Sequence, residues 1–155
     1  MIRILFVCHG NICRSPMAEF VMKALVDKQG LSSRFEIASA ATHTDALGCR
    51  PHRGTRERLA LVGISTEGKQ ARLINRADYN RYDYIVAMDE WNVYDLERTF
   101  SGDPDHKISL LLAHAGINRE VADPWYTGDF NKTYDDVYLG CTALLNKLTD
   151  GRQDF

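Results

Sequence analysis

Residues 1–15 read MIRILFVCHGNICRS, and the segment from Cys8 to Ser15 within this stretch decides the fold. The apolar run at residues 4–7 shows no polar alternation, so it predicts a strand that is buried on both faces. Arg14 follows the cysteine after five intervening residues, and a pattern with helical spacing begins directly after it. A turn between a strand and a helix brings backbone N–H groups and the helix N-terminus together, and both favour a bound anion. The stretch therefore predicts an anion-binding loop that carries a thiol and a guanidinium.

The residue types in this loop suit phosphoryl transfer. Arg14 can hold two oxygens at once, which suits a phosphoryl group better than a lysine would. The positive field of the loop favours the thiolate form of Cys8 near neutral pH, and a thiolate is a nucleophile. We therefore predict a phosphate-binding loop that forms a phosphocysteine. The alternative is an ordinary buried cysteine, which Arg14 at this spacing disfavours.

The rest of the chain predicts strands that alternate with helices. Short apolar runs predict strands at residues 2–7, 35–40, 83–88 and 107–110. Helical spacing predicts helices from about residue 16 to Gly30, over 55–62, from Asp89 or Glu90 to about Phe100, and over 134–148. This order predicts an α/β fold. We expect one domain over residues 1–155, with a parallel sheet of about four strands, helices on both faces and the phosphate-binding loop after the first strand.

Three polar residues near the loop have local roles that the sequence suggests. Ser15 can cap the helix that follows, with Pro16 at its first position, or its hydroxyl can donate to the Cys8 sulfur. We expect Glu19 to complement the helix dipole in the first turn. Asn11 suits a turn that needs a positive φ.

Four segments of the chain resemble one known protein family. The pattern C-x5-R-S at Cys8–Ser15, followed by Pro-Met-Ala-Glu, resembles the loop of the low-molecular-weight protein tyrosine phosphatases. Ser39–Thr42 and Met88–Asn92 resemble the segments after that family's second and third strands, and Ala122–Tyr126 resembles its acid loop. C-x5-R alone is a weak signal. Together with an Asp-Pro pair and two aromatics near the other end of the chain, it is a specific one.

The resemblance implies hydrolysis of protein phosphotyrosine through a phosphocysteine. In this scheme Cys8 is the nucleophile, and Arg14 and the loop amides hold the phosphoryl oxygens. Asp123 protonates the leaving tyrosyl oxygen and later activates water. The residues expected to bind substrate lie in the loop and beside the acid: His9, Gly10, Asn11, Ile12, Cys13, Ser15, Trp125 and Tyr126.

The assignment of the acid has alternatives within the sequence. An Asp-Pro pair such as the one at Asp123 most often marks a turn. Trp125 and Tyr126 beside it can wall a pocket for a flat ring, which favours the catalytic role. Asp129 is the nearest other candidate. Asp89 suits a helix N-cap, and the resemblance implies that it lies near the phosphate loop and is not the acid.

Two further activities remain as alternatives on the same loop. Thiol-linked arsenate reductases need two more cysteines close together, whereas this chain has the isolated Cys49 and Cys141, the latter on the apolar face of a predicted helix. Protein arginine phosphatases among the relatives carry a threonine where this chain has Ile12, and the bulkier isoleucine resembles the tyrosine-directed members. We therefore favour phosphotyrosine.

The chain departs from the family pattern at two positions. Lys69 stands where relatives usually carry a histidine, so a hydrogen bond that supports the loop is either missing or rebuilt. Asp45 stands where many relatives place an aromatic residue, which predicts a more acidic wall of the cleft.

Composition limits the partners and the compartment. The 155 residues are 45% hydrophobic, and a net charge of −2 provides no general attraction for nucleic acid or an anionic membrane surface. We expect phosphotyrosine-containing proteins as partners and a monomer or weak dimer. The N-terminal apolar run is too short for a signal peptide, which predicts a cytoplasmic protein with free thiols. The histidines and cysteines lack metal-ligand spacing, so neither a metal nor a cofactor is expected.

Two patterns outside the loop have modest interpretations. The Arg-rich stretch at residues 50–58 is expected to be a solvated helix face rather than a binding patch. Residues 63–69 imitate the G-x4-G-K pattern of a nucleotide-binding loop, but Gln70 replaces the metal-binding serine or threonine, so we interpret the match as coincidence.

Cys13 lies in the same loop as the expected nucleophile. Family members with a cysteine at this position suggest that it can form a reversible disulfide with Cys8, which would make the protein redox-sensitive. The alternative is that Cys13 only packs beneath the loop.

Overall fold

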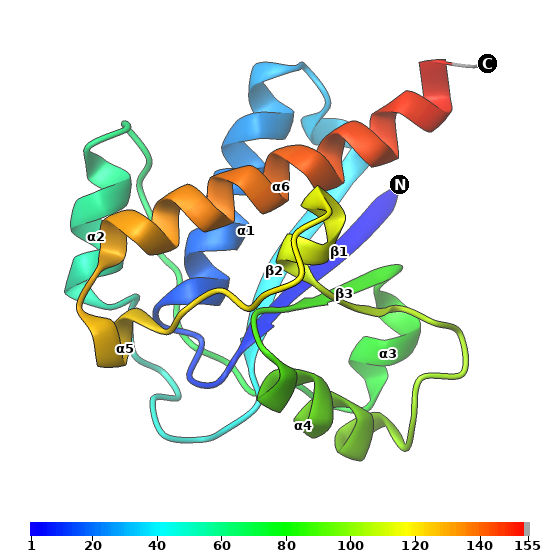
Figure 1. The fold of residues 1–155 in the computed structure, drawn as a ribbon, viewed down its shortest axis with the longest axis horizontal. Helices are drawn as coiled ribbons and strands as arrows, with labels where there is room; N and C mark the ends of the chain where they lie inside the picture. Colours follow the sequence, from blue (N-terminus) through cyan, green and yellow to red (C-terminus); the bar gives the residue numbers. More distant parts are fainter. Residues whose placement is uncertain (154–155) are drawn as a thin grey trace.

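The described part of the chain, residues 1–153 of a computed structural model, contains a four-stranded parallel sheet in the order β2-β1-β3-β4 (Figure 1). The central strand β1 (Ile2–Cys8) pairs with β2 (Phe35–Ala41) on one side and with β3 (Tyr84–Ala87) on the other. The edge strand β4 (Ile108–Leu110) pairs with β3. The α/β prediction and the expected number of strands are confirmed.

Helices cover both faces of the sheet, as expected. Figure 1 shows α1 (Arg14–Lys28), α2 (Arg53–Ala60) and α6 (Phe130–Gln153) on one side, and α3 (Ala77–Arg81) and α4 (Glu90–Phe100) on the other. The remaining short helices are the 3-10 turns η1 (Ser32–Arg34) and η2 (Leu111–Ala115) and the α-helix α5 (Pro124–Thr127).

The strand β1 lies at the centre of two hydrophobic cores. Ile4 and Phe6 pack with the residues of α1 and α6, whereas Leu5 and Val7 pack with those of α3 and α4 on the other face. All four side chains are fully buried, which explains why this strand shows no polar alternation. The register places Val7 beside Ala40 and Ala87, so the carboxyl ends of three strands meet at one edge. Cys8, Ser39 and Asp89 are therefore brought to the same edge of the sheet.

The prediction for Glu19 in the first turn of α1 is wrong, and of the two roles considered for Ser15 the N-cap is excluded. The helix begins at Arg14 with Cys13 as its N-cap residue, and no side chain caps it, so Ser15 is inside the helix. The first turn contains no acidic residue, because Glu19 lies beyond it and its carboxylate binds Ser39 and Lys23. Both polar side chains serve the loop rather than the end of the helix.

Helix boundaries differ elsewhere from the sequence pattern. The helix α6 begins at Phe130, earlier than the expected residue 134, and it extends to Gln153. The sequence pattern missed α3 and α5, which are too short to show a helical period. Within residues 1–153, no helix has the length and apolar character needed to cross a membrane.

Candidate active site

The loop between β1 and α1 holds its carbonyl groups away from its centre. The Cys8 carbonyl accepts from Thr42 N at 3.0 Å, the His9 carbonyl from His43 N at 3.0 Å, and the Ile12 carbonyl from His52 N at 2.7 Å. Segments after β2 therefore hold the loop from outside. Because these acceptors are engaged, the loop can curl with its N–H groups on the inner side.

The backbone N–H groups of the loop have no protein acceptor within the described residues. Among the described residues, none of the backbone N–H groups from His9 to Cys13 donates to a protein atom. Asn11 adopts a φ of 57°, the left-handed conformation that its sequence position suggested. A series of free N–H groups at a helix N-terminus is a site for a tetrahedral anion.

Ser15 and Asn11 lie beneath the loop and hold the sulfur of Cys8. Ser15 Oγ lies 3.0 Å from Cys8 Sγ, and the Ser15 backbone N–H donates to the same sulfur at 3.4 Å. Asn11 Nδ2 donates to Ser15 Oγ at 2.8 Å, which leaves the serine hydroxyl hydrogen free to point at the sulfur. The second of the two roles considered for Ser15 is therefore the one the structure supports.

Asn11 and Ser15, which were expected to bind substrate, direct their side chains to the loop and its neighbours. Both side chains are fully buried and do not line the cleft, because they are engaged with the loop itself. Asn11 also donates to Ser39 Oγ at 2.9 Å and accepts from Arg72 N at 3.2 Å. The two side chains therefore hold the Cys8 sulfur in place, and only the backbone N–H of Asn11 is left free to face an anion.

Lys69, which stands where relatives usually carry a histidine, supplies hydrogen bonds that support the loop. Its ammonium donates to the Ser39 carbonyl at 3.0 Å and lies 3.4 Å from Glu19 Oε1. Ser39 Oγ in turn donates to Glu19 at 2.6 Å and accepts from Asn11. Burial lowers the pKa of Lys69, and the charge of Glu19 opposes this effect only in part. A chain of polar contacts therefore runs from Lys69 to the residues beneath Cys8.

Arg14 is a buried cation between two carboxylates. Only 2% of it is exposed, and it donates through Nη1 to Asp89 Oδ2 at 2.7 Å and to the Val121 carbonyl at 3.0 Å. Its Nη2 donates to Asp123 Oδ2 at 3.3 Å. Burial lowers the pKa of Arg14, but the negative charges of Cys8, Asp89 and Asp123 outweigh burial and leave the pKa raised. The buried Nε has no protein acceptor within residues 1–153, so it is available for a phosphoryl oxygen.

Asp123 combines a structural role with the geometry of the expected acid. It is the N-cap of α5, where Oδ1 accepts from Trp125 N at 3.0 Å and Pro124 occupies the first turn. Its other oxygen contacts Arg14 and faces the cleft that contains Cys8. The turn and the catalytic role considered for this residue are therefore compatible. Asp89 caps α4, as expected, and also contacts Arg14.

A cleft of about 410 Å³ opens above the loop. Of the residues expected to bind substrate, six line it: His9, Gly10, Ile12, Cys13, Trp125 and Tyr126. Trp125 is 62% exposed and Tyr126 is 85% exposed, so both aromatics stand at the rim. The set of expected site residues omitted Trp91, which also lines the cleft and is 76% exposed. A signal was available, because an aromatic residue in the first turn of a helix, two residues after its Asp89 cap at the carboxyl edge of the sheet, is poorly placed for the core.

Asp45 contributes an acidic group to the rim, as its departure from the family pattern suggested. Its Oδ2 lies 2.6 Å from His9 Nε2, and this hydrogen bond lowers the pKa of Asp45. The His9 ring stacks on His43 with the ring centres 4.0 Å apart, and His43 Nε2 lies 2.9 Å from Asp95. The His9–Asp45 pair therefore lines the cleft, and the His43–Asp95 pair supports it from behind through the stacked rings.

The four cysteines are unpaired. Cys13 is buried and lines the cleft, and burial with the nearby charges of Cys8 and Asp123 raises its pKa to about 12. Cys141 is fully buried on α6, as predicted, and burial raises its pKa, whereas Cys49 is exposed. No group of three or more histidine, cysteine or acidic side chains within residues 1–153 could hold a metal ion.

A buried cation and free loop amides around one thiol define a cysteine-dependent phosphatase. The family model described as low molecular weight phosphotyrosine protein phosphatase matches residues 3–154, and the chain belongs to that family. It is therefore a hydrolase of the phosphotyrosine phosphatase class.

Individual relatives agree over almost the full chain. The low molecular weight protein-tyrosine-phosphatase YfkJ of Bacillus subtilis is 38% identical, covering 99% of each chain, and its crystal structure matches with a TM-score of 0.94 over 97% of this chain and 96% of that one. A low molecular weight phosphotyrosine protein phosphatase of Schizosaccharomyces pombe is 38% identical and covers 99% of this chain and 94% of its own. The structure of a Drosophila arginine phosphatase is 32% identical, with a TM-score of 0.87 over 95% of this chain and 98% of that one.

Proposed function

We propose that this chain hydrolyses protein phosphotyrosine by two successive displacements at phosphorus, with Cys8 as the nucleophile. The observation that carries the proposal is the position of Arg14. Its buried guanidinium contacts Asp123, and its Nε has no protein acceptor within residues 1–153. One cation therefore links the anion-binding loop to the expected acid.

In the first displacement, the loop binds the phosphoryl group and Cys8 attacks it. The free N–H groups from His9 to Cys13 and the Arg14 guanidinium hold the three non-bridging oxygens. The Cys8 sulfur forms a bond to phosphorus while the bond to the tyrosyl oxygen breaks. Asp123 gives its proton to that oxygen, so that tyrosine leaves as a neutral phenol. The Ser15 hydroxyl, 3.0 Å from the sulfur, stabilises the thiolate before attack.

In the second displacement, water hydrolyses the phosphocysteine. The carboxylate of Asp123 accepts a proton from the attacking water, and the Cys8–phosphorus bond breaks. Inorganic phosphate and the thiolate are the products. The Ser15 hydroxyl again favours this step, because it stabilises sulfur as the leaving group.

The walls of the cleft support an aromatic substrate. Cys8 is 3% exposed and lies at the base, whereas Trp91, Trp125 and Tyr126 stand exposed at the rim. A tyrosyl ring is long and flat enough to pass between these aromatics and present its phosphoryl group to the loop. A phosphoseryl side chain is shorter and makes no ring contacts. This difference supports phosphotyrosine as the substrate.

The two alternative activities have weaker support. Arginine phosphatase activity is named for one structural relative. At the position where arginine-directed relatives carry a threonine, this chain has Ile12, which resembles the tyrosine-directed members and lines the cleft. Thiol-linked arsenate reduction needs two further cysteines close together, but Cys141 is fully buried within α6 and Cys49 lies on another segment.

Turnover of matched peptides tests the proposal. Three peptides of one sequence, carrying phosphotyrosine, phosphoserine or phosphoarginine at the same position, are compared by release of inorganic phosphate. We expect the phosphotyrosine peptide to have the highest kcat/KM by at least about tenfold, because only its tyrosyl ring contacts the aromatic residues at the rim of the cleft. Cys8→Ser is the control, because it keeps the loop amides and removes the nucleophile. Preference for phosphoserine or phosphoarginine would contradict the proposal.

We also propose that the protein acts in the cytoplasm on phosphotyrosine-containing proteins, as a monomer or weak dimer. Four unpaired cysteines support a reducing compartment. We further propose that Cys8 and Cys13 form a reversible disulfide under oxidising conditions. Their position in one short loop supports this pairing, since a disulfide needs Cα atoms within roughly 7 Å.

A further inference from the structure

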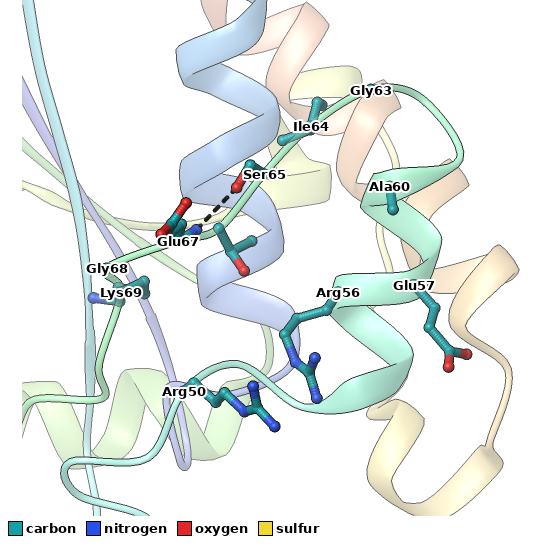
Figure 2. A pocket seen from close by; sticks show the side chains of 11 residues that line it. Arg50, Arg56, Glu57, Ala60, Gly63, Ile64, Ser65, Glu67, Gly68 and Lys69 are labelled. Carbon is teal, nitrogen blue, oxygen red and sulfur yellow. Dashed lines mark hydrogen bonds between the residues drawn. The ribbon is translucent and has the colours of Figure 1, made fainter.

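A second hollow, of about 780 Å³, lies beside α2 (Figure 2). One wall comes from α2 and the residue Arg50, and the other comes from residues 63–69, the segment that imitates a nucleotide-binding loop. That segment is followed by no helix of the kind a nucleotide-binding loop requires, which agrees with the interpretation as coincidence. Both sequence patterns that the active site does not use therefore meet at this hollow.

We propose that Arg50 and Arg56 form a second binding site for a phosphoryl group at this hollow. Both side chains line it, and Figure 2 shows their guanidinium groups pointing to the same end. Within the described residues 1–153, neither arginine forms an ion pair with a carboxylate. Two positive guanidinium groups that line the same hollow repel each other, and a dianion that contacts both offsets this repulsion.

The arginines of the stretch 50–58 have separate roles. Arg53 forms a salt bridge with Glu57 one turn along α2, and the Arg58 guanidinium lies over the Tyr134 ring, 4.0 Å from its centre. Arg56 is half-buried, and its Nε donates to the Pro51 carbonyl at 3.0 Å, which fixes the direction of the side chain. The expectation of one solvated helix face is therefore incomplete, because part of the stretch is held in place without an acidic partner.

The other charged groups around the hollow are engaged elsewhere or face away from the arginines. Glu57 is paired with Arg53, and Lys69 donates to Ser39 and contacts Glu19. Figure 2 shows the Glu67 carboxylate next to Ser65, away from the end to which the two guanidinium groups point. The arginine end of the hollow therefore carries positive charge without a nearby carboxylate to neutralise it.

This site is attached to the active-site loop by direct hydrogen bonds. His52 N, between the two arginines in sequence, donates to the Ile12 carbonyl at 2.7 Å. Thr55 Oγ1, next to Arg56, donates to the Cys13 carbonyl at 3.2 Å.

The bound phosphoryl group has two possible sources. One is a second phosphorylated residue of the substrate, which rests on the proposed function, and the other is a free phosphorylated small molecule.

The first arm of the test uses doubly phosphorylated peptides. Each peptide carries the hydrolysed phosphotyrosine and a second phosphoryl group, on serine, at one of several spacings, and kcat/KM is compared with the singly phosphorylated peptide. For a substrate source we expect a gain of about 3- to 20-fold at one spacing, lost in Arg50→Gln/Arg56→Gln and reduced by added salt. Arg34→Gln/Arg98→Gln is the matched control, because it removes two exposed positive charges that neither line the hollow nor pair with a carboxylate within residues 1–153, and it is expected to keep the gain.

The second arm uses inorganic phosphate and backbone amide NMR, with sodium chloride at equal ionic strength as the reference. For a free ligand we expect shifts at Arg50, Arg56 and residues 66–68 that saturate independently of those at residues 9–15. These shifts are expected to disappear in Arg50→Gln/Arg56→Gln, and the spectrum of that variant also reports whether it is folded. The single variant Arg50→Gln, at an exposed position, serves if the double variant unfolds.

The two arms give separate answers. A gain with doubly phosphorylated peptides identifies the substrate as the source, and phosphate shifts without that gain identify a free ligand. The same peptide gain in the double variant as in the wild type, or no gain and no phosphate shifts in the wild type, overturns the site. Failure of the proposed function is distinct, because it appears as no turnover of the singly phosphorylated peptide by the wild type while the NMR arm remains readable.

Discussion

Replacing Asp123 with asparagine separates its structural role from its role as acid. Asparagine is as good an N-cap as aspartate, so the hydrogen bond from Trp125 N that begins α5 is retained. The contact of Asp123 with Arg14 is long, at 3.3 Å, and Arg14 keeps Asp89 and the Val121 carbonyl as partners. We therefore expect the free energy of unfolding to fall by no more than about 1 kcal/mol.

The effect on catalysis is expected to be much larger. General acid catalysis contributes roughly 10²- to 10⁴-fold. At about 1.4 kcal/mol for each factor of ten, this loss corresponds to about 3–5.5 kcal/mol of transition-state stabilisation. The loss is expected to be greatest for leaving groups near the phenol of tyrosine, whose pKa is about 10, because these need the proton most. It is expected to be small for strongly acidic phenols, which leave as anions.

The assay is kcat/KM, which reports the first displacement alone, for a series of aryl phosphates with leaving groups of graded acidity, measured for the wild type and Asp123→Asn. The slope of log kcat/KM against leaving-group pKa is expected to become steeper in the variant, and the basic limb of its pH–rate profile is expected to flatten. Asp129→Asn is the matched control, since Asp129 lies close in sequence and was the other candidate. Equal losses for good and poor leaving groups would refute the reasoning and move the acid role elsewhere.

Three further predictions follow from the loop and its support. Cys8→Ser is expected to lose turnover by at least about 10³-fold and still bind inorganic phosphate, because the loop amides and Arg14 remain; a phosphoenzyme trapped in the wild type on another residue would contradict this. Lys69→Met removes the contacts of the ammonium group to Ser39 and Glu19, so kcat is expected to fall about 3- to 30-fold with little change in phosphate affinity. Lys69→His is expected to restore most of the lost kcat. An unchanged kcat in Lys69→Met would show that this support of the loop is dispensable. The pKa of Cys13 is raised to about 12, above the assay range, so its thiolate fraction is expected to rise about tenfold per pH unit from pH 7 to 9, and the rate of Cys8–Cys13 disulfide formation after peroxide treatment is expected to rise with it. Cys13→Ser is expected to recover less activity than the wild type when dithiothreitol is added. Equal recovery in the two proteins would leave Cys13 as a packing residue.

The sequence was sufficient for those features that depend on local pattern. The apolar run at residues 4–7 could be interpreted without a structure, because a strand with no polar alternation must be covered on both faces. The same applies to Cys8 and Arg14, whose spacing across a strand-to-helix turn specifies the loop. Asp89 was identifiable as a cap from its position after a strand, and the structure confirms a capping box with Asn92.

Features that depend on contacts between distant segments were not available from the sequence. Ser15 had two chemically reasonable roles, and two structural facts decide between them: α1 begins at Arg14, and Asn11, with a φ of 57°, donates to the Ser15 hydroxyl. Glu19 was assigned to the helix dipole, because nothing local shows that Ser39 and Lys69 approach it. The sequence reports the type of each side chain but not which partner reaches it.

Arg14 shows how a single buried side chain converts a local motif into a site. The motif at Cys8–Ser15 predicts phosphate binding, but it does not indicate what holds the guanidinium in place when no phosphate is present. In the structure Asp89, at the end of β3, and Asp123, before α5, both contact Arg14. A buried cation of this kind is stable only with such partners, because an unpaired charge would be costly to desolvate. The two carboxylates that stabilise the arginine therefore also hold Asp123, the proposed acid, on the same side of the cleft as Cys8, the proposed nucleophile, so three distant segments of the chain must fold together to complete this site.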